Sequence, residues 1–92
     1  MENETTKPLT LGEQRCHIDF NPSADDKIGK FKRMMADAID FLNQEDKDTE
    51  LRGDEYMEQA RCFKIAMEHL ETAQMYGVKA ISKSLKVTNK NK

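Results

Sequence analysis

The apolar residues of this chain follow two helical patterns of unequal length. The first runs from Ser23 to about Leu42, and its apolar residues recur at steps of three and four, as on one face of an amphipathic helix. The second begins near Gly53 and continues to Leu85. These helices would be roughly 30 and 45 Å long, so a hairpin would leave about ten residues of the second without a partner. We therefore expect an all-α fold, an antiparallel two-helix hairpin that buries its unmatched stripe in a homo-oligomeric helical bundle.

The composition describes one small domain without membrane segments. The chain has 92 residues, and none of its apolar runs approaches the roughly 18 residues of a transmembrane helix. Its acidic N-terminus lacks the apolar stretch of a secretory signal. The two cysteines, Cys16 and Cys62, are too few for a disulfide framework. We expect a cytoplasmic protein that does not bind membranes.

Three segments divide the chain. Residues 1–9 are polar and are predicted to be flexible, residues 10–86 form the helical-hairpin domain, and residues 87–92 form a disordered basic tail. Apolar and polar residues alternate between Leu11 and Phe20, which predicts a short extended segment before the hairpin. Arg15 and His17 would then share one face of that segment.

The boundaries of the hairpin follow from local signals. Ser23 is a good N-cap, with Asp26 three residues later in the position of a capping box. The first helix is predicted to end near Leu42-Asn43, because residues 44–53 are charged and poor in apolar side chains. Gly53 precedes acids that suit the first turn of a second helix.

A stripe of small residues on the second helix favours close helix contact. Ala66, Ala73 and Ala80 recur at intervals of seven, and Gly77 lies between the last two. Glycine inside a helix costs about 1 kcal/mol relative to alanine, so helix propensity does not explain Gly77. The alternatives are that alanine is simply a strong helix former, or that the stripe leaves room for a flat ligand. The predicted oligomer interface combines the stripe with neighbouring apolar residues: Ala66, Ala73, Gly77, Ala80, Met75, Val78 and Ile81.

Signals for catalysis or metal binding are weak. Acid pairs with i, i+3 spacing occur at Asp37/Asp40, Glu55/Glu58 and Glu68/Glu71, and such pairs bind magnesium in all-α nucleotide pyrophosphatases. Their helical phase points them away from the apolar seams and from one another. The set Cys16, His17, Cys62 and His69 fits no short zinc motif. We expect no catalytic residue, metal or cofactor, and keep the pyrophosphatase as a remote alternative.

The C-terminal half could bind phosphate through side chains. Residues 1–50 hold seven basic and twelve acidic residues, whereas residues 51–92 hold eight and five. Lys79, Lys83 and Lys86 fall on one helix face, and Tyr76 precedes Lys79 by one turn and could stack on a base. A solvated helix end and a packing role for Tyr76 are the alternatives. The charge does not indicate DNA or RNA binding.

Two stretches carry a family resemblance: Leu11 to Arg15 leading to Phe20-Asn21-Pro22-Ser23, and Glu71 to Ala80. Together they resemble the helical-hairpin domain of the phage anti-CBASS protein 2 and anti-Thoeris protein 1 sponges, over about residues 10–84. The resemblance implies an oligomer, often a hexamer, that sequesters cyclic oligonucleotide or cyclic ADP-ribose-type messengers without cleaving them. In an infected bacterial host, this would block anti-phage immune signalling.

The resemblance also implies positions for ligand contact, namely Arg15, Phe20, Asn21, Tyr76 and Lys79. The residue after Tyr76 is Gly77, where the family motif has alanine, and the chain has no β-rich extra domain. With the residues chosen for their charge, the predicted ligand-binding set is Arg15, His17, Phe20, Asn21, Tyr76, Lys79 and Lys83. The competing interpretation is a structural or regulatory oligomerisation module without a nucleotide ligand.

Overall fold

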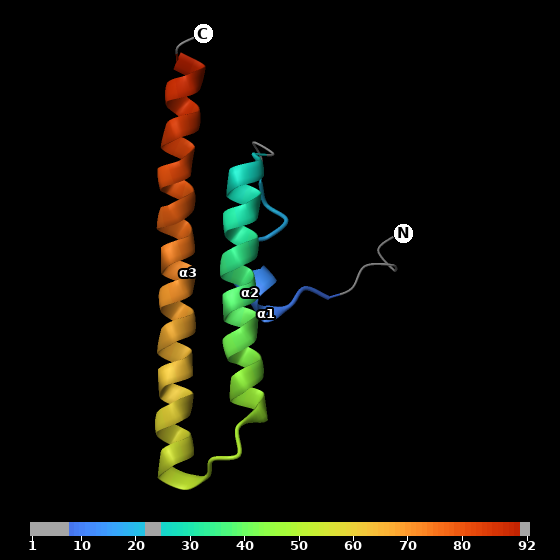
Figure 1. Ribbon diagram of the computed structural model, residues 1–92, viewed down its shortest axis with the longest axis vertical. Coiled ribbons are helices and arrows are strands. Elements are labelled where there is room, and N and C mark those ends of the chain that lie inside the picture. The colour runs from blue at the N-terminus through green and yellow to red at the C-terminus, as the bar shows by residue number, and fades with distance from the viewer. Residues whose placement is uncertain (1–7, 22–24, 91–92) are drawn as a thin grey trace.

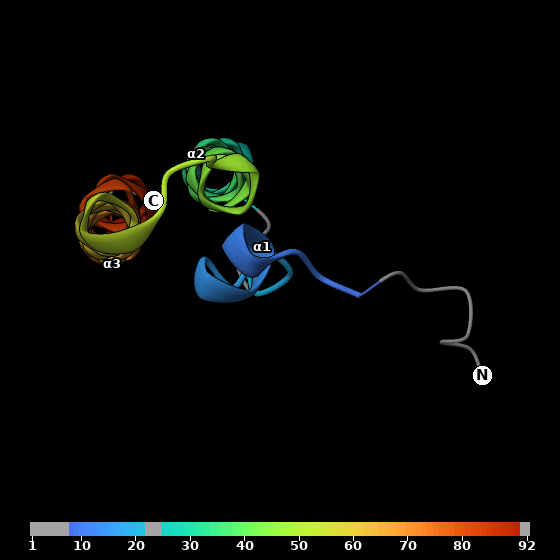
Figure 2. The same ribbon diagram turned by 90° about the horizontal axis from the view of Figure 1, so that it is seen from below.

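The computed structural model describes residues 8–21 and 25–90, and these form three helices. They are α1 (Leu11–Arg15), α2 (Asp26–Asp48) and α3 (Gly53–Lys90). Helices α2 and α3 run antiparallel and side by side, and α1 lies against α2 on one side of the pair (Figures 1 and 2). The predicted all-α class is confirmed for this part of the chain. Helices α2 and α3 form one layer, and α1 lies outside that layer (Figure 2).

Helix α1 replaces the predicted extended segment, and that prediction was wrong. Thr10 and Glu13 form a reciprocal capping box, in which the Thr10 side chain accepts from the Glu13 N–H at 3.1 Å. The Glu13 carboxylate in turn accepts from the Thr10 N–H at 2.9 Å. These bonds satisfy two backbone donors that a short helix would otherwise leave unpaired. The cap therefore favours a helical turn over the extended conformation that the alternating pattern indicated.

The end of α1 turns the chain back toward α2. The Ile18 N–H donates to the Glu13 carbonyl at 3.0 Å and the His17 N–H donates to the Gln14 carbonyl at 3.3 Å, the two bonds of a Schellman motif. His17 occupies the left-handed position of this motif with φ 49°, where glycine is usual. Arg15 and His17 therefore do not share a strand face. Arg15 ends the helix, and His17 makes the reversal.

Helix α1 docks on α2 through a glycine and a carboxylate. The Asp40 carboxylate accepts from the Gly12 N–H and from the Thr10 hydroxyl, each at 2.7 Å. Gly12 is buried, and a Cβ added there would overlap the Ala36 carbonyl group. The backbones of α1 and α2 can approach this closely because Gly12 has no side chain. The hydrogen bonds to Asp40 fix the position of α1 along α2.

Helix α2 differs from its predicted bounds at both ends. Asp25 is its N-cap and accepts from the Ile28 N–H at 3.0 Å, whereas the predicted cap, Ser23, lies outside the described residues. The helix continues to Asp48, so the predicted end near Leu42-Asn43 was wrong, and only residues 49–52 of the predicted loop over 44–53 lie outside the helices. Long polar side chains sustain an exposed helix as well as apolar ones do. The Gln44 amide also donates to the Asp48 carboxylate at 2.9 Å, an i, i+4 bond along the last turns.

Helix α3 is the longer partner, as expected, and the part that projects past α2, from about residue 82 to Lys90, is close to the expected ten residues. Its start at Gly53 agrees with the sequence, and it continues to Lys90. Gly77 lies against the ring of Phe31, which places the first turn of α2 beside about Ile81. Beyond that point α3 projects past α2 (Figure 1). Helix α3 includes residues 87–90 of the predicted disordered tail, while residues 91–92 and residues 1–7 of the predicted flexible N-terminus lie outside the described part.

The core is small and lies where all three helices meet. Its buried members are Cys16, Ala36, Ile39 and Met67. Of the apolar residues that define the predicted face of α2, Ile28 is buried, whereas the others remain partly exposed: Phe31, Met35, Ala38 and Leu42. Helix α1 covers a second side of α2, which accounts for the deeper burial of Ala36 and Ile39. The sequence pattern indicated only the side that faces α3.

The two cysteines are expected to differ in reactivity. Burial, followed by the nearby negative charge of Glu71, raises the pKa of the Cys16 thiol. Cys62 is exposed on α3. The thiolate is the reactive form, and the reagent must be able to reach it. We therefore expect one thiol per chain, that of Cys62, to react rapidly with Ellman's reagent at pH 8. Cys62→Ser should remove that fast phase, and rapid reaction in the Cys62→Ser variant would contradict the burial of Cys16.

Helix α3 is long enough to cross a bilayer but is not apolar enough. It has 38 residues, against the roughly 20 that a membrane span requires. Charged side chains recur along it, and none of the helices in residues 8–21 and 25–90 has the hydropathy of a membrane span.

Candidate ligand-binding surface on helix α3

Two predicted ligand-binding residues line a hollow on α3. Tyr76 and Lys79, together with Met75, surround a space of about 230 Å³. The Tyr76 side chain is 65% exposed, and the Lys79 ammonium lies 5.9 Å from the centre of its ring. An aromatic ring beside a cation can bind the face of a base and a phosphate at the same time. This pair therefore has the chemistry expected of a nucleotide site.

The hollow faces away from α2. Gln74 is buried on the side of α3 that packs on the hairpin partner. At about 100° per residue, Tyr76 lies roughly 160° and Lys79 roughly 140° around the helix from Gln74. Both side chains therefore project from the outer side of α3, where no other described segment of the chain lies (Figure 2). Among the described residues, one wall of this hollow is present, formed by α3 alone.

Positive charge continues along the same side of α3. Lys83 is exposed and lies one turn beyond Lys79, close to it in helical phase. The chain has no acidic residue after Glu71, so no carboxylate of this segment neutralises the two lysines. An anion near Tyr76 would interact with both cations.

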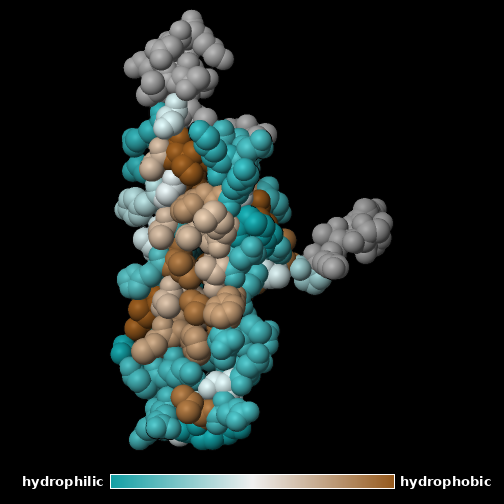
Figure 3. Space-filling view, in the orientation of Figure 1, coloured by the Kyte–Doolittle hydropathy of each residue, from teal (hydrophilic) through white to brown (hydrophobic). Residues whose placement is uncertain are grey.

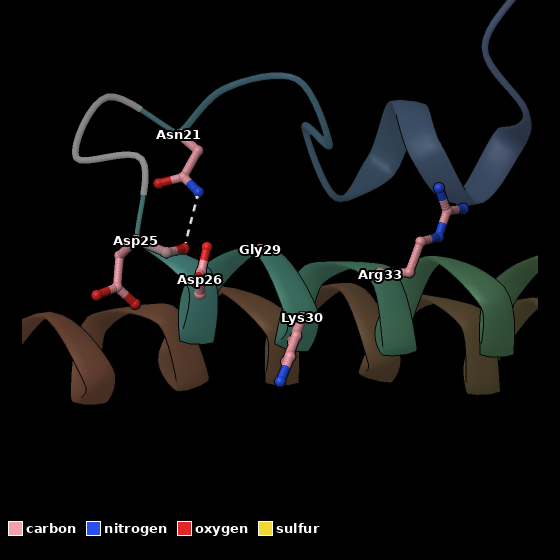
Figure 4. Close-up of a pocket in the computed structure, with 6 residues that line it drawn as sticks. All are labelled: Asn21, Asp25, Asp26, Gly29, Lys30 and Arg33. Carbon is pink, nitrogen blue, oxygen red and sulfur yellow. Dashed lines mark hydrogen bonds between the residues drawn. The ribbon is translucent and has the colours of Figure 1, made fainter.

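Asn21 lines a different hollow, shown in Figure 4. Its side-chain N–H donates to the Asp25 carbonyl at 3.1 Å, which ties the chain to the start of α2. This space of about 370 Å³ is lined by Asn21, Asp25, Asp26, Gly29, Lys30 and Arg33. Two carboxylates stand at the helix N-terminus, where they would repel a phosphate. The structure therefore separates Asn21 from the Tyr76 hollow and gives it a structural contact.

Arg33 in this second hollow is already paired. It contacts the Glu13 carboxylate at 3.0 Å and the Asp37 carboxylate at 3.1 Å. The capping bond from Thr10 and the Arg33 guanidinium together lower the pKa of Glu13. These pairs link α1 to α2 and leave little of the Arg33 charge for a ligand.

Phe20 packs beside a buried lysine that the sequence analysis did not identify. Lys32 is only 4% exposed, and its ammonium donates to the carbonyls of His17 (3.0 Å) and Phe20. The same ammonium lies 5.5 Å from the centre of the Phe20 ring. Lys32 thus holds the turn after α1 against α2. Its position four residues after Ile28, on the buried side of the helix, was the available signal.

Arg15 and His17 lie at the C-terminal end of α1. Arg15 is half-buried, and one of its terminal nitrogens is buried with no hydrogen-bond partner among the described residues. His17 is exposed, although its backbone is fixed by the turn. Neither lines the hollow formed by Met75, Tyr76 and Lys79. Of the predicted set, the structure therefore places Tyr76 and Lys79 at this hollow, with Lys83 one turn away on the same helix.

The acid pairs have different structural roles. Asp37 pairs with Arg33 on the surface, whereas Asp40 holds α1. Glu58 pairs with Arg61 at 3.0 Å, and this bond lowers the pKa of Glu58. Within residues 8–21 and 25–90, no three histidine, cysteine or acidic side chains are grouped to hold a metal ion. Asp37, Asp40 and Glu58 thus make structural contacts within the chain.

The predicted interface residues fall into two groups. Ala66, Ala73 and Ala80 are partly or fully exposed, and Met75 is 59% exposed beside Tyr76. Val78 and Ile81 are partly buried, and Gly77 accommodates the Phe31 ring within the same chain. An apolar band runs along the joint surface of α2 and α3 in Figure 3. The close contact predicted for Gly77 is therefore made inside the hairpin.

No protein-family model, curated protein or solved structure matches this chain.

Proposed function

We propose that this chain is a non-catalytic sponge for cyclic nucleotide messengers. The observation that carries the proposal is the exposed Tyr76 ring beside Lys79 in the hollow on the outer side of α3. A cyclic di- or trinucleotide, or a cyclic ADP-ribose-type messenger, presents flat bases and phosphates. Stacking on Tyr76 and ion pairing with Lys79 and Lys83 would recognise both groups.

Assembly is part of this proposal. The hollow has one wall, so a second protomer would have to enclose the ligand. We propose a homo-oligomer, with a hexamer expected from the resemblance to the anti-CBASS and anti-Thoeris sponges. Sequestration of the messenger in the host cytoplasm would then interrupt anti-phage signalling without any chemical step.

A second candidate function is an oligomerisation module that binds no nucleotide. The exposed apolar band along α2 and α3 favours it, because such a surface is explained by assembly alone. The two functions differ in one measurable property: only the sponge changes its affinity for nucleotides when Lys79 is altered.

Lys79→Glu is expected to weaken binding by at least about 30-fold, because it replaces a phosphate-binding cation by a repelling anion. Isothermal titration calorimetry would use cyclic dinucleotides, cyclic trinucleotides and cyclic ADP-ribose isomers as probes. Lys64→Glu is the matched control, since it makes the same charge change at another exposed lysine of α3, roughly 22 Å away along the helix.

Helicity and oligomeric mass should be unchanged in both variants, because Lys79 and Lys64 are exposed. If Lys79→Glu bound as tightly as the wild type, the hollow would not be the site. If the wild type bound none of the probes, the assembly module would be the better account.

A further inference from the structure

The face of the hairpin opposite α1 carries two complementary rows of side chains. On α2, Met34 and Phe41 are 63% and 64% exposed. On α3, Ala66, Ala73 and Ala80 form the small-residue stripe, and the last two are exposed. Residues seven apart lie within about 20° of each other on a helix, so each row follows one side of its helix. The row on α2 consists of large side chains and the row on α3 of small ones, and the members of each row are seven residues apart.

The Phe31–Gly77 contact places both rows on the same broad face. Phe31 lies one turn from Met34, and Gly77 lies one turn from Ala73 and from Ala80, so the rows flank this contact. Helix α1 instead contacts α2 through Asp40, which is about 120° around α2 from Met34. Figure 2 shows α1 on one side of the hairpin, and Figure 3 shows the apolar band on the other.

The two rows are also in register. Phe31 and Gly77 lie at the same height, and α2 and α3 are antiparallel. Met34 is three residues after Phe31 on α2, so it is level with the residue three before Gly77 on α3, which is Gln74, next to Ala73. Moving ten residues to Phe41 reaches the height of Met67, next to Ala66. Each large side chain of α2 is level with one alanine of α3.

We infer that a second copy of this chain covers this face through a two-fold axis parallel to the helices. That operation lays α2 of each copy over α3 of the other without a shift along the helix. Met34 of one copy then meets Ala73 of the other, and Phe41 meets Ala66. Because the same patch is used twice, every large side chain receives a small one. The result is a four-helix bundle whose neighbouring helices are all antiparallel.

The size of the face suits such a contact. Helix α2 has 23 residues and is roughly 35 Å long. Two helices about 9 Å apart present a face some 20 Å wide, so each copy would bury roughly 700 Å². Stable interfaces bury about 800 Å² per partner. This interface deepens the assembly part of the proposed function, and it is expected whether or not a nucleotide binds.

Light scattering coupled to size-exclusion chromatography, without ligand, tests the surface. The wild type should have at least twice the 10.6 kDa mass of the chain. Met34→Glu combined with Phe41→Glu should lower that mass at least twofold while circular dichroism retains the helical signal. Met57→Glu is the matched control, because Met57 is 67% exposed and lies about 180° around α3 from Ala66. A monomeric wild type, or an unchanged mass in the double variant, would overturn the inference.

Disulfide trapping tests the symmetry and register. Two variants would be co-expressed and oxidised: one chain carries Met34→Cys and the other carries Ala73→Cys, and both carry Cys62→Ser. Their cross-linked dimer should form at least tenfold faster than that of Met34→Cys with Ala66→Cys, which is displaced by roughly 10 Å along the helix. Equal rates for the two pairs would overturn the proposed register. Failure of nucleotide binding would leave both results unaffected.

Discussion

Gly12→Ala is expected to destabilise the folded chain by about 3 kcal/mol, although alanine is the better helix former. A Cβ at Gly12 would overlap the backbone carbonyl of Ala36 and come within 2.9 Å of the Asp40 carboxylate. Helix α1 would have to move off α2, which strains the packing around Cys16 and weakens the hydrogen bond from the Gly12 N–H. Urea unfolding followed by circular dichroism, at one fixed protein concentration, would measure the change.

Gly29→Ala is the control for Gly12→Ala. Gly29 is also in a helix, but its added Cβ would lie 3.7 Å from the Asn21 side chain, an ordinary contact. This variant should gain about 1 kcal/mol from helix propensity. Opposite signs for the two glycines would support the docked position of α1. A stabilising Gly12→Ala would contradict it.

Asp40→Ala, as a single substitution, is also expected to lower the free energy of unfolding by about 3 kcal/mol. The carboxylate accepts two hydrogen bonds at 2.7 Å, from the Gly12 N–H and the Thr10 hydroxyl. Hydrogen bonds to a charged group contribute about 1.5–3 kcal/mol each, and alanine would leave the partly buried Gly12 N–H unpaired. The free energy of unfolding in urea at pH 7 is the quantity to measure.

Asp37→Ala provides the comparison, because it removes the other acid of the same i, i+3 pair. The Asp37 side chain is 66% exposed and pairs with the surface guanidinium of Arg33. Its loss should change the stability by less than about 0.5 kcal/mol. Equal effects of Asp37→Ala and Asp40→Ala would mean that Asp40 does not anchor α1.

The sequence predicted the features that depend on local pattern. Apolar steps of three and four located the two long helices, and Gly53 marked the start of the second. The end of the first helix was missed because residues 44–48 are polar but still helical. Absence of apolar residues indicates an exposed segment, and it does not distinguish a loop from the solvated end of a helix.

Helix α1 shows how a cap can override an alternating pattern. Thr10 and Glu13 have the spacing of a capping box, and this signal was present in the sequence. The docking of α1 was not predictable in the same way, because the roles of Gly12, Lys32 and Asp40 require positions far apart in the chain to meet. The amphipathic pattern of α2 therefore showed one buried side where the structure has two.

The candidate site was predictable only where its residues are neighbours on one helix. Tyr76, Lys79 and Lys83 follow each other at helical spacing, so their juxtaposition needs nothing beyond α3 itself. Phe20 and Asn21 lie after α1, and their positions depend on the turn at His17 and on Lys32. Residues of a site that forms between protomers cannot be assigned from one chain.

A sponge would hold its cyclic messenger without altering it, and the release of bound ligand measures this property. The purified protein would be mixed with cyclic di- and trinucleotides and cyclic ADP-ribose isomers, freed of unbound ligand, and heat-denatured. Mass spectrometry would then identify what is released. An intact cyclic ligand should be released in fixed proportion to the protein. Release of a linearised product, or of nothing from the whole panel, would contradict it.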